Sequence, residues 1–223
     1  MGRLDANLRS GPQMSMYRAL TRDLVRQEPG RLLDWGCGWG QMTSLLLEAG
    51  VDAVAFDYRA GLEAPITEAL PHFPELEAHL SSEPVELPFE ADSFDTVLSC
   101  GVLEHVPYPD DSLDEIRRVL RPGGMFYVAN LPNRFSYTER AARLLGHYYH
   151  GQLPDDRVYT ARTARELLEQ HGFQVVQVRR THMLPLTLGG PAQPIWALSS
   201  ALERIPGLNL VATSLELAAR TEA

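Results

Sequence analysis

Apolar positions along this chain alternate between the spacing of a helix and the short continuous runs of a buried strand. Apolar residues recur at helical spacing from Met14 to Val25, and Pro29 and Gly30 separate them from the next apolar run. The pattern predicts further helices over residues 41–48, 112–121 and 163–171, and strands over residues 31–34, 51–56, 76–80, 94–100, 125–130 and 173–178. Because helices alternate with strands, we expect a doubly wound α/β fold with parallel strands and right-handed crossovers.

Two short segments have the composition of a capping box, in which a Ser or Thr at the helix start pairs with an acidic residue three positions later. Ser112 and Glu115 form the first, and Thr163 and Glu166 form the second. We therefore expect two of the helices to begin at Ser112 and Thr163.

The segment from Thr181 onward departs from this alternation. It contains a link rich in proline and glycine, an amphipathic stretch around Trp196, and an apolar run over residues 211–219. We interpret the last as an antiparallel strand at the edge of the sheet. With it, the sequence predicts a mostly parallel seven-stranded sheet with helices on both faces.

The charge balance narrows the classes of partner. A net charge of −9 disfavours a surface that neutralises nucleic-acid phosphates or an anionic membrane, because both need clustered Lys and Arg. The first residues lack the apolar run of a signal peptide, and no stretch approaches the roughly 18 apolar residues of a membrane span. The two cysteines, Cys37 and Cys100, are expected to be reduced thiols. These features predict a cytoplasmic protein with a small-molecule partner, no nucleic acid and no membrane span.

A glycine-rich turn connects the first predicted strand to the helix that follows it. It contains Gly36, Gly38 and Gly40, and glycines allow the backbone to approach a ligand that side chains would exclude. A dinucleotide-binding turn needs its third glycine one residue later, at Gln41, so the spacing disfavours a nicotinamide oxidoreductase. Asp34, at the strand end, would also repel a pyrophosphate and attract a cation.

Two further carboxylates follow the turn. Asp57 ends the second predicted strand, at a separation from Asp34 that suits a carboxylate accepting two ribose hydroxyls. Glu83 precedes the strand over residues 94–100 and could face an adenine amino group. Alternatively, the two aspartates only cap turns and Glu83 lies in solvent. Three carboxylates around a nucleoside without phosphates favour a cationic adenosine ligand, such as S-adenosylmethionine.

These residues belong to a longer series of motifs. In order they are Leu33-Asp34-x-Gly36-x-Gly38-x-Gly40, Asp57, Leu87-Pro88-Phe89 with Ser93-Phe94-Asp95-x-Val97, Val102-Leu103-Glu104-His105-Val106, and Leu120-Arg121-Pro122-Gly123-Gly124. The series covers about residues 31–130 and resembles the class I S-adenosylmethionine-dependent methyltransferases of the broad small-molecule type. The resemblance implies a Rossmann-like methyltransferase fold, S-adenosyl-L-methionine as the methyl donor and S-adenosyl-L-homocysteine as its product.

The resemblance also implies a cofactor site. The residues it assigns are Asp34, Gly36, Cys37, Gly38, Asp57, Tyr58, Glu83, Pro84 and Cys100. In this assignment the backbone from Gly36 to Gly38 meets the methionine part, with Asp34 near its amine. Asp57 holds the ribose, and Glu83 and Pro84 frame the adenine. Pro84 departs from the family pattern, because proline has no N–H to offer to the adenine ring.

The acceptor side is less constrained, since methyl transfer needs in-line alignment and needs a base only when the acceptor arrives protonated. His105 follows a strand end that would face the methyl donor, and we assign it as a candidate general base. Alternatively, Glu104 and His105 only order the loop. Candidates for the acceptor pocket are Tyr17, Asn130, Tyr137, His147, Tyr149 and His150. The aromatic cluster at 147–150 could instead form a small core beneath a loop. We expect no metal site, because His147 and His150 lack an evident carboxylate or cysteine partner.

The sequence therefore predicts one methyltransferase domain over residues 1–223. Its parts are an N-terminal helical cap (1–30), a cofactor-binding core (31–130), an acceptor-pocket insertion (131–160) and C-terminal helices and edge strands (161–223). The predicted function is methyl transfer from S-adenosylmethionine to O, N or C of a small molecule by in-line displacement. The alternative is a catalytically silent methyltransferase-like protein that binds the cofactor or scaffolds a partner.

Overall fold

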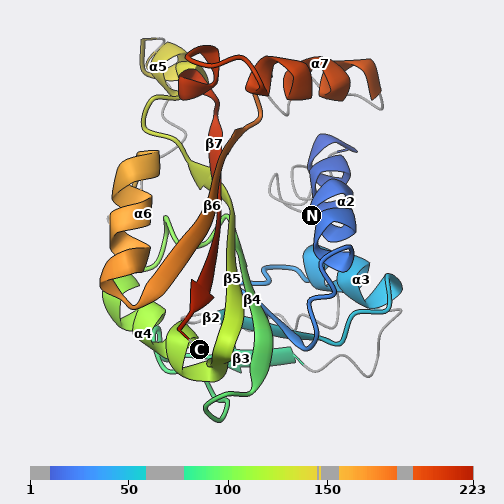
Figure 1. Cartoon of the computed structure of the whole chain (residues 1–223), viewed down its shortest axis with the longest axis vertical. Helices are drawn as coiled ribbons and strands as arrows, with labels where there is room; N and C mark the ends of the chain where they lie inside the picture. Colours follow the sequence, from blue (N-terminus) through green and yellow to red (C-terminus); the bar gives the residue numbers. More distant parts are fainter. Residues whose placement is uncertain (1–10, 59–77, 145, 147–155, 185–192, 223) are drawn as a thin grey trace.

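A seven-stranded sheet forms the centre of the molecule (Figure 1). The computed structural model describes residues 11–58, 78–144, 146, 156–184 and 193–222. The strands are β1 (Leu32–Trp35), β2 (Ala53–Tyr58), β3 (Ala78–Ser81), β4 (Phe94–Cys100), β5 (Leu120–Pro132), β6 (Phe173–Thr181) and β7 (Ser214–Thr221), in the order β3-β2-β1-β4-β5-β7-β6. The pairs among β1 to β5 are parallel, whereas β7 is antiparallel to β5 and β6. The predicted mostly parallel sheet is confirmed.

The antiparallel strand near the C-terminus is also confirmed, but its predicted position at the edge is wrong. β7 lies between β5 and β6, and Ala218 is paired with Tyr127 on one side and with Gln177 on the other. Most of its side chains are buried on both faces of the sheet, which explains why its sequence is a nearly continuous apolar run. The edge strand is β6, where Val176 is half exposed.

Helices cover both faces of the sheet, as predicted. They are α2 (Gly11–Val25), α3 (Gln41–Glu48), α4 (Pro109–Val119), α5 (Tyr137–Leu144), α6 (Ala161–Gln170), α7 (Gln193–Glu203) and the 3₁₀ helix η3 (Leu208–Val211). In Figure 1, α2 and α3 lie on one side of the sheet and α4 and α6 on the other. Each side has its own apolar cluster: Leu24 and Leu46 pack with Leu98 on the first, and Ile116 and Leu168 belong to the second.

Both predicted helix starts are wrong: the N-cap of α4 is Tyr108, which makes no side-chain capping bond, and the N-cap of α6 is Thr160, three residues before Thr163. α4 begins at Pro109, a residue suited to the first helical position, and Ser112 is buried inside the helix with its hydroxyl donating to the Tyr108 carbonyl at 2.7 Å. α6 has Thr160 as its N-cap, and Thr163 completes that capping box from the third helical position. Local composition located the helices correctly, but the tertiary packing of α4 and a second threonine upstream of α6 set where they start.

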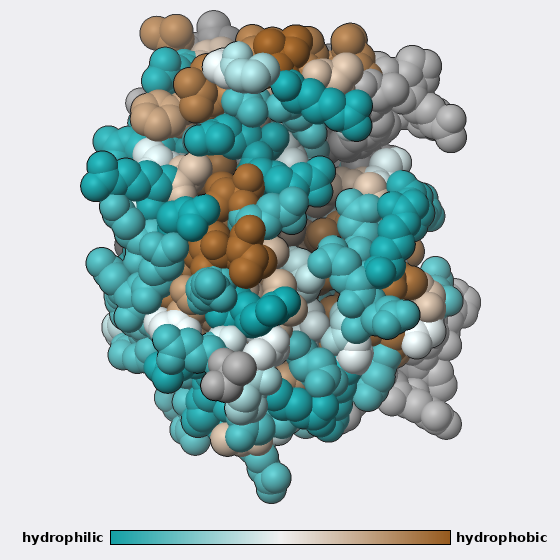
Figure 2. Space-filling view, in the orientation of Figure 1, coloured by the Kyte–Doolittle hydropathy of each residue, from teal (hydrophilic) through white to brown (hydrophobic). Residues whose placement is uncertain are grey.

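The carboxyl ends of the parallel strands meet at one edge of the sheet, where ligands bind in folds of this type. α5 and α7 lie beyond this edge, at the top of Figure 1. Hydrophobic side chains gather over the same end in Figure 2, where α7 and η3 expose Leu198, Leu208 and Leu210. None of the helices that the structure describes is both long and apolar enough to cross a membrane.

Candidate functional site

The glycine turn after β1 folds back on β2. The N–H groups of Gly36 and Cys37 both donate to the Phe56 carbonyl, at 2.8 and 2.9 Å. Gly36 has a positive φ of 77°, and a Cβ there would lie 2.4 Å from the Val102 side chain, so no other residue fits without displacement. Gly38 also has a positive φ, but its missing Cβ faces open space. Within the turn, the Gly40 N–H donates to the Cys37 carbonyl at 2.8 Å, so both N–H and carbonyl groups of the turn hold its conformation.

A cavity of about 460 Å³ opens beside this turn at the ends of β1, β2 and β4. Its lining residues are Trp35, Gly36, Phe56, Asp57, Tyr58, Pro84, Val102, His105, Val106, Pro107 and Tyr108. The structure thus brings together predicted residues from four separate segments of the chain. Glu83 is not among the lining residues and its side chain is exposed.

Asp34 lies in the floor of the turn and is only 2% exposed. The Thr43 hydroxyl on α3 donates to Asp34 Oδ2 at 2.5 Å. Burial raises the pKa of Asp34 to about 6 although the Thr43 hydrogen bond lowers it, and the negative charge of Asp57 adds to the rise. A buried carboxylate with one hydroxyl donor is poorly stabilised alone and favours a cationic ligand beside it.

Tyr17 and Cys100 lie close enough to Asp34 to feel its charge. Burial, followed by the charge of Cys100, raises the pKa of Tyr17, and Gln13 donates to its hydroxyl at 2.8 Å. Burial raises the pKa of Cys100 far above its usual value, with further contributions from Asp34 and Glu104. The Cys100 thiol therefore stays protonated and is no nucleophile. Cys37 and Cys100 are both free thiols, as predicted.

His105 stands at the wall of the cavity between two acidic side chains. Its Nδ1 lies 2.7 Å from Asp156 Oδ1, and its Nε2 lies 3.9 Å from Glu104 Oε1. The His105 side chain is 42% exposed, whereas the side chains of Glu104 and Asp156 are each 4% exposed. A buried aspartate that fixes one ring nitrogen leaves the other to face a reactant, which is the geometry of an oriented general base.

Glu104 turns away from the solvent at the end of β4. Burial raises its pKa to about 7, although the charge of His105 opposes the rise and that of Asp156 adds to it. Its Oε2 has no hydrogen-bond partner within the described part of the chain. The backbone of Arg157 donates to the Glu104 carbonyl at 2.8 Å, and the Arg157 guanidinium bonds the Val106 and Pro107 carbonyls. The segment that carries Asp156 is therefore tied to the turn that carries Glu104 and His105.

The candidates for the acceptor pocket are dispersed. Asn130 ends the central part of β5 with a positive φ of 56°, and its Oδ1 accepts from Ser214 at 3.2 Å. It lines a separate cavity of about 120 Å³. The Tyr137 hydroxyl donates to the Met183 carbonyl at 2.9 Å and so ties α5 to the segment after β6. His147, Tyr149 and His150 lie outside the described residues. Within the described ranges, no group of three or more His, Cys, Asp or Glu side chains could hold a metal ion.

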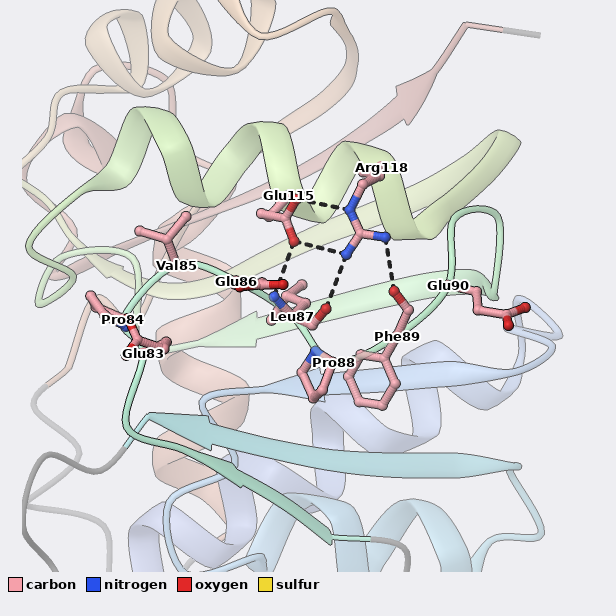
Figure 3. A pocket seen from close by; sticks show the side chains of 10 residues that line it. All are labelled: Glu83, Pro84, Val85, Glu86, Leu87, Pro88, Phe89, Glu90, Glu115 and Arg118. Atoms are coloured by element: carbon pink, nitrogen blue, oxygen red, sulfur yellow. Dashed lines mark hydrogen bonds and ion pairs between the residues drawn. The ribbon is translucent and has the colours of Figure 1, made fainter.

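A further cavity of about 660 Å³ lies beneath α4 and is lined by residues 83–90 with Glu115 and Arg118 (Figure 3). Arg118 donates to the Leu87 and Phe89 carbonyls at 3.0 and 2.8 Å, and Glu115 accepts from the Leu87 N–H at 3.0 Å. Glu115 and Arg118 are also paired with each other at 2.8 Å. Figure 3 shows both side chains reaching from α4 to this loop. This network anchors the segment that carries Pro84 to α4.

Sequence reasoning missed three residues of this region. Tyr108, 54% exposed, lines the cavity immediately before α4, and Asp156 and Glu104 flank His105. Glu104 stands within a recognisable motif, but its burial depends on the packing around the end of β4. Asp156 lies 51 residues from His105 and has no local signal.

The family profile of a methyltransferase domain matches residues 13–178 of the chain. This chain belongs to the methyltransferase family. Its sheet with a reversed seventh strand is the fold of the S-adenosylmethionine-dependent members, as solved structures across the family show. The family assignment and the Rossmann-like methyltransferase fold predicted from the motifs are therefore confirmed.

Relatives of this methyltransferase-family chain differ in their acceptors. A demethylmenaquinone methyltransferase of Renibacterium salmoninarum is 33% identical over 140 residues, which cover 60% of this chain and 57% of that protein. A tRNA U34 carboxymethyltransferase of Azotobacter vinelandii is 41% identical over 103 residues, which cover 45% and 32% of the two proteins. The chain thus matches about half or less of the length of these relatives.

A solved structure supports the fold along nearly the whole chain. The 1,6-didemethyltoxoflavin-N1-methyltransferase of Burkholderia thailandensis, solved with its substrate and S-adenosylhomocysteine, has a TM-score of 0.62 and 21% sequence identity. The match covers 98% of this chain and 82% of that protein.

Proposed function

We propose that this methyltransferase transfers a methyl group from S-adenosylmethionine to an oxygen, nitrogen or carbon of a small molecule. One observation carries the proposal: Gly36, Asp57 and His105, which lie far apart in the sequence, line one cavity beside the buried Asp34 carboxyl. When bound, S-adenosylmethionine supplies a methyl group on a cationic sulfur, and the acceptor supplies the lone pair. The protein's task is then to align the two reactants and exclude water.

The cavity fits the methyl donor chemically. The buried Asp34 carboxyl suits the ammonium and sulfonium charges, since both groups are cations. Asp57 at the end of β2 can accept the ribose hydroxyls, and the open space at Gly38 lets the backbone approach the ligand. Tyr58 and Tyr108 present exposed rings at the cavity and can cover the adenine. Pro84 lines the same cavity and contacts the adenine without a hydrogen bond.

We assign His105 as the general base for acceptors that arrive protonated. Asp156 holds Nδ1, so a proton taken up at Nε2 is stabilised by a nearby negative charge. The exposed portion of the imidazole lets that proton leave to the solvent.

We also propose that the chain acts as one domain over residues 1–223, works in the cytoplasm and does not bind nucleic acid, in keeping with its net charge of −9. The silent alternative is less favoured, because every charged group of the donor cavity is intact.

Calorimetric titration with S-adenosylmethionine, S-adenosylhomocysteine and NAD, in parallel, tests the cofactor assignment. We expect micromolar binding of the first two and none of NAD, and we expect Asp57→Ala to weaken binding by about 1–3 kcal/mol. A release assay for S-adenosylhomocysteine with a panel of phenols, quinols and heterocyclic amines then tests turnover. Binding without turnover on any acceptor class would favour the silent alternative, and binding of NAD alone would overturn the proposal.

A further inference from the structure

Two polar side chains lie close to Gly101, just beyond the end of β4. Gly101 has a positive φ of 71°, and a Cβ at this position would meet two groups of the described residues within 4 Å. These are Asn130 Nδ2 at 3.4 Å and Glu104 Oε1 at 3.8 Å, both at ordinary contact distance. The absence of a side chain at Gly101 therefore leaves room for an atom of a ligand between a hydrogen-bond donor and a carboxyl group.

Glu104 has the features of a group prepared for a ligand. Its residue is 3% exposed, yet Oε2 has no hydrogen-bond partner among the described residues. A buried carboxyl oxygen without a partner is unfavourable in the folded chain, so its presence needs an explanation. The hydroxyl of Tyr159, whose pKa the charge of Glu104 helps to raise, is likewise buried and unpartnered in the described structure. Two orphaned groups in one region indicate that a hydrogen-bonding molecule belongs there.

Asn130 supplies the hydrogen-bond donor that complements the Glu104 carboxyl. Its Oδ1 accepts from Ser214 on β7, which fixes the orientation of the amide, and its Nδ2 lies beside Gly101. The positive φ of Asn130 places the side chain at this point of the strand, where Gly101 N–H donates to the Ala129 carbonyl at 3.0 Å. The donor thus lies on β5 and the acceptor in the loop that follows β4, and these two strands pair in a fixed parallel register.

Resting on the proposed function, we propose that Glu104 and Asn130 together bind the polar edge of the methyl acceptor. Glu104 accepts a hydrogen bond from an N–H or O–H of the acceptor, and Asn130 Nδ2 donates one to a neighbouring carbonyl oxygen. The acceptor class is therefore a molecule in which a donor stands beside a carbonyl, such as a cyclic amide or a hydroxy-ketone. A simple amine or an isolated hydroxyl satisfies only one of the two groups.

The electrostatic surroundings agree with this role. The groups that face the Glu104 carboxyl are His105, Asp156, Cys100 and Tyr159, of which only His105 can become cationic. Because burial holds the pKa of Glu104 near 7, the carboxyl is a stronger hydrogen-bond acceptor above that pH than below it. In this arrangement His105 acts as the base on the reacting atom, while Glu104 and Asn130 hold the edge next to it.

Matched probes separate this inference from the proposed function. We would measure binding of 2-quinolone and N-methyl-2-quinolone to the full chain saturated with S-adenosylhomocysteine, since the two differ only in the N–H that Glu104 would accept. The wild-type complex is expected to bind 2-quinolone at least tenfold more tightly. Glu104→Met removes the acceptor and retains a flexible side chain of similar length, so it should reduce the affinity for 2-quinolone to that of the N-methyl compound.

Asn130→Gly tests the other half without straining the positive φ. It should weaken both probes by a similar factor of several-fold or more, because both retain the carbonyl. Glu216→Met is the matched control: Glu216 is a glutamate on β7 whose pKa burial also raises, but it is paired with Arg179 at 3.5 Å. The control should retain the tenfold preference.

Ligand affinity and melting temperature together distinguish a recognition role of Glu104 from a structural one. Glu104→Met should retain the affinity for S-adenosylhomocysteine and melt no more than slightly below wild type, because Oε2 has no partner among the described residues and Oε1 has only a 3.9 Å contact with the His105 ring. The recognition role of Glu104 is wrong if wild type binds neither quinolone or binds both equally. It is also wrong if Glu104→Met retains the preference for 2-quinolone over N-methyl-2-quinolone. A large drop in melting temperature for Glu104→Met would assign it a structural role instead. If wild type does not bind S-adenosylhomocysteine at all, the proposed function itself is refuted.

Discussion

Asp34→Asn should make the ligand-free protein more stable while weakening its methyl-donor site. The Asp34 carboxyl is 2% exposed and its pKa is raised to about 6, from 3.8 in an unfolded chain. Between these two values the folded state binds more protons than the unfolded state, so stability falls as the pH rises through this window. The full penalty, about 3 kcal/mol, applies above pH 6 or so.

Asparagine removes this penalty and retains an oxygen for the Thr43 hydroxyl, which lies 2.5 Å from Asp34 Oδ2. We expect Asp34→Asn to gain about 1–3 kcal/mol of unfolding free energy at pH 7 and almost nothing at pH 4. The same change removes the negative charge opposite a cationic ligand. Affinity for S-adenosylhomocysteine should fall by roughly 1.5–3 kcal/mol, the usual worth of a charged hydrogen bond.

Urea denaturation at pH 4, 5.5 and 7, together with calorimetric titration at the same values, provides the assay. The control is Asp52→Asn, which removes an equal charge from a side chain that is 73% exposed. Wild-type affinity should also fall about tenfold from pH 7 to pH 5, since a protonated Asp34 no longer attracts the cation. Equal stability of Asp34→Asn and wild type at every pH, or an affinity independent of pH, would refute this reasoning.

Three further changes test the structure around the site, each by urea denaturation. Gly36→Ala should cost about 2–5 kcal/mol, because its Cβ would lie 2.4 Å from Val102 at a positive φ, and Val102→Ala in the same chain should recover part of the loss. Arg118→Ala should cost about 2 kcal/mol, since it removes bonds to two carbonyls and Glu115, and an unchanged midpoint would contradict the anchoring role. Burial lowers the pKa of His171, but bonds to two aspartates of α4 outweigh it and leave the pKa raised. Their stabilisation is present below pH 6.5 and declines as the pH rises through the folded pKa, and His171→Asn should flatten this dependence.

The elements of the donor half could be predicted because their signals are local. Asp34, Gly36 and Asp57 stand at fixed positions relative to strands that the apolar pattern reveals, and the structure places these residues around or beside one cavity. The position of β7 could not be predicted, because an apolar run shows that a strand is buried but not which two strands it separates. Glu83 illustrates the same limit, since its distance along the chain says nothing of the direction in which a loop side chain points.

The acceptor half depends on contacts between distant segments. His105 and Asp156 are 51 residues apart, and Asn130 and Glu104 both come near Gly101 because β5 pairs with β4 in a register that aligns Ala129 with Cys100. No spacing rule connects such residues, whereas the register of a parallel sheet does so once the strand order is known. A methyltransferase can therefore keep one donor motif and change its acceptor through few substitutions at the ends of β4 and β5. The different acceptors named for the relatives of this chain agree with that division.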